Sequence, residues 1–352
     1  MPHIRLLRAS TLALAALLAA GSLQAATLIV ANKSEATVSL VALPSGKLAA
    51  TLPVGEGPHE VGVSRDGKLA LVANYGTSPK PGSTLTLIDV PGAKVVKTID
   101  LGEYRRPHGI TWVDNRRALV TSEESKTLLV VDVEAGKVER AIPTGQEISH
   151  MVAALADGSR AYIANIGSGS MTAIDLKDGK ALASVPTAAG AEGIDVTPDG
   201  KQVWITNRAA NSVTVVDAAT LQVLGTLESP KFPIRAKATP DGRWMLVTNA
   251  QSGDMSVFSV ADRKLMRRVP FEVKVAETDG RLKGDFAGSS VPIGVLIDPE
   301  GRRAYVAHAN GDRISVVDLK AWKVTGSLTA GKEPDGMGYS KLDVKAGSTS
   351  GR

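Results

Sequence analysis

The chain has 352 residues, no cysteine and a formal net charge of +5 at pH 7. The missing cysteine excludes a disulfide framework, a thiolate zinc site and a cysteine nucleophile. The scattered basic residues form no arm or cluster of the kind that favours specific nucleic-acid binding. Glycine is abundant, with 35 residues, whereas aromatic residues make up only 4%, and this mix is typical of short strands joined by tight turns.

The N-terminal segment predicts a secretory signal peptide over residues 1–25. Arg5 and Arg8 precede an apolar run over residues 11–20, and small residues follow as far as Ala25. The run is too short for a stable membrane-spanning helix, and no later apolar stretch is long enough to cross a bilayer. We therefore expect a periplasmic product without a membrane span, whose charge falls to +3 when both arginines are removed.

A short apolar segment recurs seven times, and its last residue is usually Asn. The copies are LIVAN, LVAN, LVTS, YIAN, WITN, LVTN and YVAH, and their ends lie 42, 48, 43, 42, 42 and 59 residues apart. A second strand ending in Asp follows most copies, then a third strand, and a fourth precedes an Asp-Gly turn in several units. A period near 42 residues with four short strands per unit predicts a propeller blade.

The sequence thus predicts an all-β fold, a seven-bladed β-propeller with four antiparallel strands per blade, over residues 26–341. A lone four-stranded sheet cannot bury both faces, so the blades must stack around an axis. The strand that the first blade lacks occurs at the other end of the chain as EPDGMGYS (333–340). We expect this C-terminal strand to complete the N-terminal blade and close the ring, with a flexible tail over residues 342–352. We also expect a monomer.

The repeated motifs resemble those of the YVTN-repeat family of bacterial β-propellers, the YncE-like group. The resemblance rests on the LVAN-, YIAN- and WITN-type strands, the VxVxD strands and the P-H-G and D-G segments, and it covers about residues 27–341. It implies the propeller fold but no particular reaction, because similar propellers include binding proteins, lactonases and redox-associated subunits. It also implies that the loops entering the innermost strands lie on the binding face.

Aligning the starts of the seven expected innermost strands brings most titratable candidates to one position. The strands begin GPHE, RPHG, ISHM, GAEG, FPIR, VPIG and EPDG. Their third position holds His59, His108, His150, Glu192, Ile234, Ile293 and Asp335. Glu60 and Arg235 come one residue later, and His308 replaces the usual Asn of its repeat, which is expected on the same face.

We therefore expect a site at the mouth of the central channel. The candidate ligand-binding residues are His59, Glu60, His108, His150, Glu192, Arg235, His308 and Asp335, and the candidate metal ligands are His59, His108 and His150. Imidazoles beside carboxylates suit copper, zinc or iron better than calcium. The repeated Asn and Asp positions are interpreted as structural, because Asn tolerates positive φ in turns and both residues bond to nearby backbone.

Three interpretations of the candidate site remain open. The residues line a wet channel without further function, or they bind a transition metal, or they hydrolyse a substrate as in propeller lactonases, with Arg235 holding a substrate oxygen. An exported binding protein for a metal, a small anionic ligand or a partner protein is favoured, and a lactonase-type or redox-associated enzyme is the alternative. Four arginines, Arg105, Arg106, Arg208 and Arg235, favour an anion unless nearby carboxylates pair with them.

Overall fold

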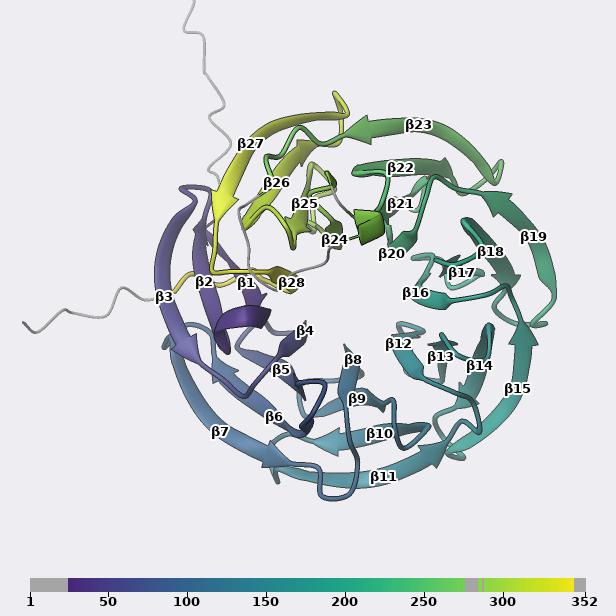
Figure 1. Ribbon diagram of the computed structural model, residues 1–352. Coiled ribbons are helices and arrows are strands. Elements are labelled where there is room, and N and C mark those ends of the chain that lie inside the picture. The colour runs from purple at the N-terminus through teal and green to yellow at the C-terminus, as the bar shows by residue number, and fades with distance from the viewer. Residues whose placement is uncertain (1–24, 276–283, 287, 345–352) are drawn as a thin grey trace, which may run out of the picture.

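Seven four-stranded antiparallel sheets form a ring in the computed structural model, which describes residues 25–275, 284–286 and 288–344 (Figure 1). The predicted seven-bladed, all-β propeller is confirmed. Nearly all of the expected signal peptide lies outside the described residues. No helix in the part of the chain that the structure describes is long and apolar enough to span a bilayer.

Each blade is numbered here in chain order, and its innermost strand lies at the axis. Blade 1 consists of β28 (Pro334–Ser340), β1 (Ala26–Asn32), β2 (Thr37–Leu43) and β3 (Lys47–Pro53). Blade 2 consists of β4 (Pro58–Val63), β5 (Leu69–Gly76), β6 (Pro81–Asp89) and β7 (Lys94–Asp100). Blade 3 consists of β8 (Pro107–Trp112), β9 (Arg117–Ser122), β10 (Thr127–Asp132) and β11 (Lys137–Pro143). Blade 4 consists of β12 (Ser149–Ala154), β13 (Arg160–Asn165), β14 (Ser170–Asp175) and β15 (Lys180–Pro186).

The last three blades follow the same order. Blade 5 consists of β16 (Ala191–Val196), β17 (Gln202–Asn207), β18 (Ser212–Asp217) and β19 (Val223–Glu228). Blade 6 consists of β20 (Pro233–Ala238), β21 (Trp244–Asn249), β22 (Asp254–Ser259) and β23 (Lys264–Pro270). Blade 7 consists of β24 (Pro292–Ile297), β25 (Arg303–His308), β26 (Arg313–Asp318) and β27 (Lys323–Thr329). Two short 3₁₀ helices, η1 (Lys33–Glu35) and η2 (Gly284–Phe286), lie in connections.

The ring closes as predicted, because the C-terminal strand β28 pairs with the N-terminal strand β1. Thr27 lies opposite Ser340, and Val30 lies opposite Met337. The packed structure continues slightly past the expected boundary at residue 341, since Val344 is buried against blades 1 and 2. The rest of the predicted tail lies outside the described residues.

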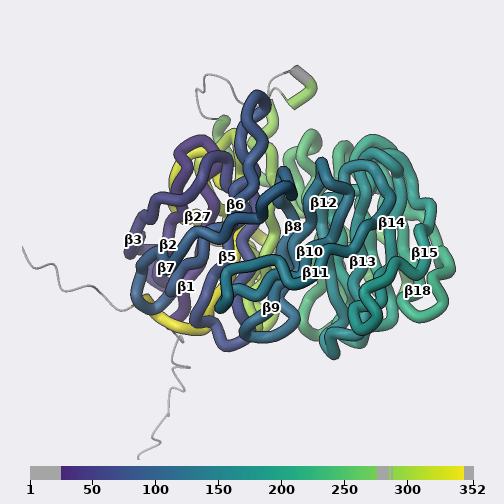
Figure 2. Tube along the Cα trace, turned by 90° about the horizontal axis from the view of Figure 1, so that it is seen from below, coloured from purple at the N-terminus to yellow at the C-terminus, as the bar shows by residue number. Residues whose placement is uncertain are grey.

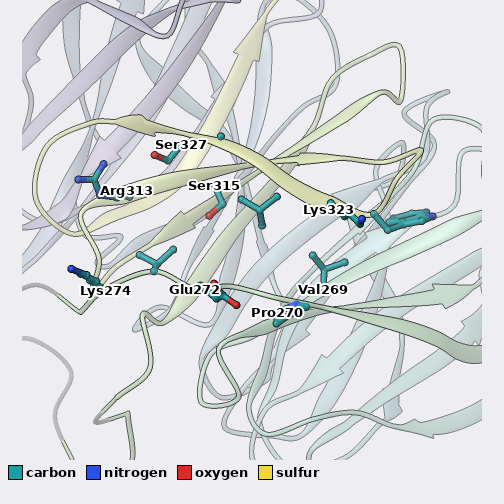
Figure 3. A pocket seen from close by; sticks show the side chains of 12 residues that line it. Val269, Pro270, Glu272, Lys274, Arg313, Ser315, Lys323 and Ser327 are labelled. Carbon is teal, nitrogen blue, oxygen red and sulfur yellow. The ribbon is translucent and has the colours of Figure 1, made fainter.

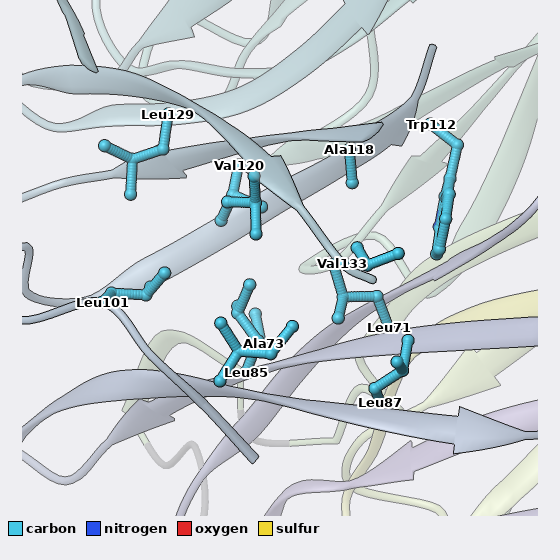
Figure 4. Packing of buried hydrophobic residues seen from close by; sticks show 12 residues of the cluster. Leu71, Ala73, Leu85, Leu87, Leu101, Trp112, Ala118, Val120, Leu129 and Val133 are labelled. Atoms are coloured by element: carbon cyan, nitrogen blue, oxygen red, sulfur yellow. The ribbon is translucent and has the colours of Figure 1, made fainter. Parts of the chain in front are cut away.

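The core is formed by apolar side chains between neighbouring blades. Figure 4 shows Leu71, Leu85 and Leu87 of blade 2 facing Val120 and Leu129 of blade 3. Alternation of side chains along each strand supplies both faces of every sheet with such residues. Each buried Leu or Val side chain contributes about 1.5–3 kcal/mol of hydrophobic stabilisation, so this packing holds the ring without a metal or a disulfide.

The repeated Asn is structural, but for a different reason from the one inferred from sequence. Asn74 Nδ2 donates to the hydroxyls of Thr84 and Thr86, and its Oδ1 accepts from the Gly55 N–H at 3.1 Å. The Asn residues at this position are buried and have no positive φ. They join strands through buried amide hydrogen bonds, so the prediction of a turn with positive φ was wrong. The repeated Asp does cap turns, as when Asp132 accepts from the Ala135 N–H at 2.9 Å.

Candidate functional site

Seven equivalent turns lead into the innermost strands and define three rings of residues around the axis. One residue in each turn has positive φ, and we call these residues the turn ring. The turn ring is Glu333, Gly57, Arg106, Ile148, Gly190, Phe232 and Val291 for blades 1 to 7. The strand ring follows two residues later and is Asp335, His59, His108, His150, Glu192, Ile234 and Ile293.

The third ring consists of the residues directly after the repeated Asn position, and we call it the rim ring. Its members are Lys33, Tyr75, Glu123, Ile166, Arg208, Ala250 and Ala309. In every blade the rim residue N–H donates to the carbonyl oxygen of the turn residue, for example Tyr75 to Gly57 at 3.2 Å and Ala250 to Phe232 at 2.8 Å. This repeated hydrogen bond holds the three rings in one register, so a side chain's place at the mouth is set by its place in the repeat.

Glycine directly after the strand ring lets neighbouring innermost strands approach closely. A Cβ at Gly109 would lie 2.7 Å from the His150 carbonyl oxygen, and one at Gly193 would lie 2.5 Å from that of Ile234. The glycine occurs in blades 1, 3, 5 and 7, whereas the blades between them carry Glu60, Met151 and Arg235. The P-H-G motif is therefore a packing device as well as the carrier of a histidine.

A cavity of about 430 Å³ lies at the axis inside these rings. Its lining residues are Lys33, His59, Tyr75, His108, Glu123, Ile148, His150, Ile166, Glu192, Arg208, Phe232, Ile234, Arg235, Ala250, Phe286, Val291, Ile293 and Asp335. Apart from Arg235 of blade 6, the titratable groups come from blades 1 to 5, and blades 6 and 7 otherwise supply apolar side chains. Figure 1 shows the innermost strands of all blades around this axis.

His108, Glu123 and His150 form the group best placed to hold a metal ion. One potential ligand atom from each lies within 4.8 Å of the others, and all three residues are buried. Nδ1 of His150 lies 2.5 Å from Oε1 of Glu123, and the two imidazole ring centres are 3.7 Å apart. The Tyr75 hydroxyl donates to the other Glu123 oxygen at 2.5 Å, which fixes the orientation of the carboxylate.

The pKa values of the two imidazoles of this group shift in opposite directions. Burial lowers the pKa of His108, and repulsion from His150 and His59 lowers it further. Burial also opposes the charge on His150, but the hydrogen bond with Glu123 and the nearby Glu192 carboxylate outweigh it and raise the pKa of His150. His108 is therefore a neutral imidazole, the form that binds metals.

Several buried ring nitrogens in the cavity have no hydrogen-bond partner among the described residues. They are Nδ1 of His59, Nδ1 of His108 and Nε2 of His150. Nε2 of His150 lies 3.4 Å from Glu192 and Nδ1 of His59 lies 3.5 Å from Asp335, which are ion-pair distances without hydrogen-bond geometry. Buried polar atoms are normally satisfied, so these nitrogens are available to water or to a ligand in the cavity.

Arg235 crosses the channel below this group. Its Nη2 donates to Glu60 Oε1 of blade 2 at 2.8 Å, and its Nη1 donates to Glu192 at 3.2 Å. Although burial disfavours the charge, Glu60, Glu192 and Asp335 raise the pKa of Arg235. Arg235 lines both this cavity and a second one of about 290 Å³, which Glu60 and Met151 also line.

The remaining charges near the cavity are also paired. Arg208 Nη1 donates to Glu192 Oε2 at 2.6 Å, and Arg106 pairs with Glu124 at 2.9 Å. Burial raises the pKa of Glu192, but the nearby His150 and the charges of Arg208 and Arg235 lower it to about 2. Because carboxylates occupy the guanidinium groups, the geometry does not support the anion site that the arginines favoured in sequence.

His59 belongs to a neighbouring pair rather than to the metal group. It stacks on Tyr75 with ring centres 4.6 Å apart, and its pKa is lowered by burial and by the charge of Lys33. Asp335 opposite it is buried, which raises its pKa to about 6. The His59 ring centre also lies 4.8 Å from that of His108, so the three predicted metal ligands lie side by side. The group whose potential ligand atoms lie within 4.8 Å of one another joins His108 and His150 to Glu123 instead of His59.

Two other cavities differ in character from the central one. A vestibule of about 770 Å³, which shares Lys33, His59 and Tyr75 with the central cavity, lies on its outer side. Figure 2 shows the β5–β6 turn and η2 extending from one face of the ring, and residues of both line these spaces. A separate cavity of about 700 Å³ lies beside β23, β26 and β27 (Figure 3), but its lining contains no histidine. We therefore place the candidate site in the central cavity.

Comparison with known proteins supports the fold and the resemblance. A family model described as a YNCE-like beta-propeller matches residues 112–235. The matched segment resembles YNCE-like β-propellers and covers blades 3 to 5 of the ring. The resemblance predicted from the repeat motifs is confirmed, and no curated protein matches the chain.

Solved structures share the fold at low sequence identity. Kuenenia stuttgartiensis hydrazine synthase matches with a TM-score of 0.62 and 21% identity, over 75% of this chain and 77% of that one. A functionally unknown protein from Desulfotomaculum acetoxidans DSM 771 matches with a TM-score of 0.74 and 13% identity, over 89% and 98%. Such identities show a common fold alone.

The YNCE-like segment includes most of the polar network but not all of it. Glu123, His150, Glu192 and Arg235 lie inside the matched range, whereas His108 lies just before it. The match therefore covers the scaffold of blades 3 to 5 but not the whole histidine cluster.

His308 does not join the other histidines in the structure. Its Nδ1 lies 2.9 Å from Ser290 Oγ and its Nε2 lies 2.9 Å from Ser315 Oγ, so it spans strands as the repeated Asn does. Burial lowers the pKa of His308 to about 3. The sequence placed His308 on the correct repeat position, but a side chain at that position points into the blade.

Glu123 and Tyr75 are the site residues that sequence reasoning missed. Both belong to the rim ring, directly after the repeated Asn position. Reading that position across all blades would have shown Lys33, Tyr75, Glu123 and Arg208 in blades 1, 2, 3 and 5, and apolar residues in the others. The pattern that identifies Glu123 and Tyr75 thus lies one residue after the repeated Asn position.

Proposed function

We propose that this YNCE-like propeller is a metal-binding protein whose central cavity holds one transition-metal ion between His108, Glu123 and His150. The observation that carries the proposal is the convergence of two buried imidazoles and one buried carboxylate within 4.8 Å. Zinc bonds to imidazole nitrogen at about 2.0–2.1 Å, so the three side chains have to shift slightly, with His150 and Glu123 moving apart, to bind one ion. Imidazole with carboxylate suits zinc, copper or iron.

The proposal accounts for details of the cluster that a channel lining leaves unexplained. Nδ1 of His108 is buried without a partner, and Tyr75 orients the Glu123 carboxylate from outside the metal group. Such outer hydrogen bonds are typical of metal sites. The lactonase-type alternative finds no support in this geometry, because Arg235 is occupied by Glu60 and Glu192.

The site of action in the proposal is the periplasm, following the expected signal peptide. Fractionation of cells that express the full chain, with N-terminal sequencing of the product, tests this part. A mature chain that begins at Ala26 in the periplasmic fraction supports it, and an intact chain in the cytoplasm contradicts it.

Elemental analysis and zinc titration of the protein, purified without chelator, test the metal site. We expect about one ion per chain in the wild type and loss of binding in His108→Ala and Glu123→Gln. His308→Asn is the matched control, because His308 is also a buried histidine but lies outside the cavity. Equal metal content in wild type and both ligand variants contradicts the proposal, provided that circular dichroism shows each variant folded.

A further inference from the structure

The wall of the cavity opposite the metal group is apolar and is built by two successive blades. Blade 6 contributes Phe232 and Ile234, and blade 7 contributes Val291 and Ile293. Phe232 packs edge-to-face against Phe286 with ring centres 5.0 Å apart. A ligand that contacts both walls therefore needs a polar end for the metal group and an apolar end for blades 6 and 7.

The large side chains of this wall stand where the backbone favours glycine. Phe232 and Val291 of this wall belong to the turn ring and have φ values of 62° and 53°. Ile148 of blade 4, at 55°, is in the same position on the polar side of the cavity. Positive φ is strongly disfavoured for β-branched and bulky residues. Gly57 and Gly190 occupy the same position in blades 2 and 5, so the turn itself does not require a side chain.

Three protein ligands leave coordination positions on a metal ion open towards the cavity. Among the charged groups nearby, Arg208 and Arg235 are engaged by Glu192 and Glu60. An occupant therefore has to bring its own donor atoms to the metal and an apolar body to blades 6 and 7. The volume of about 430 Å³ lies in the range of small-molecule sites.

We infer that the cavity binds a small organic chelator, with an oxygen-donor head on the metal ion and an aromatic or branched aliphatic body against Phe232, Ile234 and Ile293. This inference rests on the proposed function and names the ligand class of the same site. The expected occupant is neutral or singly charged, since the guanidinium groups are already paired.

Two hydroxamates with the same chelating head test the inference on protein loaded with Co²⁺. The absorption bands of Co²⁺ shift when a new ligand enters its coordination sphere, so a titration reports binding directly. We expect benzohydroxamate to bind at least about tenfold more tightly than acetohydroxamate, because only the phenyl ring reaches the apolar wall.

Phe232→Gly is the informative variant, because glycine suits the positive φ at this position. We expect it to keep Co²⁺ binding and to reduce the preference for benzohydroxamate to about threefold or less. Leu221→Gly is the matched control, since Leu221 also has positive φ, at 63°, but packs in the core of blades 4 and 5. It should keep the full preference.

The outcomes separate the two proposals. Protein that binds Co²⁺ but shows no spectral shift with either hydroxamate, or equal affinity for both, overturns the chelator inference and leaves the metal site intact. An unchanged preference in Phe232→Gly also overturns it. Failure of the wild type to bind Co²⁺ at all overturns the proposed function, and the inference with it.

Discussion

Blades 1 to 5 and blades 6 and 7 use the same turn to build opposite halves of one cavity. In both halves a residue with positive φ accepts the rim hydrogen bond, and the strand-ring residue follows two positions later. Blade 3 places His108 there and blade 6 places Ile234. The repeat therefore determines where a side chain lies, whereas departures from the repeat determine the chemistry of the cavity.

The histidines make the same point on a smaller scale. His108 occupies a position that varies from blade to blade and faces the cavity. His308 occupies a position that is Asn in most blades, and it replaces the Asn hydrogen bonds with bonds to Ser290 and Ser315. A histidine at a scaffold position is thus a structural substitute, and a histidine at a variable position is a candidate for function.

The largest expected effect comes from removing the charge that joins the two halves. Arg235→Leu leaves Glu60 and Glu192 buried without their common partner, and breaking such a buried pair costs about 3–5 kcal/mol. We expect a clear fall in the denaturant midpoint. Arg243→Leu breaks only the exposed pair with Asp241 and should change stability by less than about 1 kcal/mol. Similar midpoints for the two variants would show that the crossing ion pair does not stabilise the ring.

A smaller loss of stability is expected from a substitution between β8 and β12, the strands that carry His108 and His150. In Gly109→Ala the new Cβ meets the His150 carbonyl oxygen, and such overpacking costs about 1–3 kcal/mol. Because it moves β8 and β12 apart, zinc affinity should fall as well. Gly225→Ala, where a Cβ meets nothing within 4 Å, should alter neither quantity. Unchanged zinc affinity in Gly109→Ala would show that zinc binding does not depend on the spacing of β8 and β12.

The pH dependence of His308→Asn distinguishes the structural histidine from the others. The pKa of His308 is lowered to about 3 in the fold, while an unfolded histidine titrates near 6.5. Below pH 6.5, His308 binds a proton in the unfolded chain but stays neutral in the folded chain. The free energy of unfolding therefore falls as the pH drops from 6.5 towards 3. We expect the variant to gain about 1.4 kcal/mol over wild type between pH 8 and pH 5.5. A difference that does not change with pH in denaturant titrations would contradict this account.

The smallest change in stability is expected for Ile148, the turn-ring residue of blade 4. Ile148→Gly relieves a β-branched residue from positive φ, but glycine gains entropy in the unfolded chain, so stability should change by less than about 1 kcal/mol. Ile148 lines the cavity, and affinity for benzohydroxamate on the cobalt-loaded protein should fall. A large loss of stability would show that this side chain serves the fold rather than the cavity.

The sequence predicted the blades well because their strands and turns repeat and each repeat carries the same apolar alternation. It also brought His108, His150 and Glu192 together, since they share one position in that repeat. Glu123 could not be placed in this way, because its proximity to His150 depends on how blades 3 and 4 pack. Likewise, the pairing of Arg235 with Glu60 joins residues 175 positions apart across the channel, a contact that no local pattern encodes.

X-ray absorption at the zinc edge of the zinc-loaded protein tests the central claim most directly, because it reports the atoms bonded to the ion. The account predicts two imidazole nitrogens at about 2.0–2.1 Å with a carboxylate oxygen, and loss of one imidazole in His108→Ala but not in His308→Asn. A shell of oxygen atoms without imidazole, or an imidazole count that stays the same in His108→Ala, would contradict it.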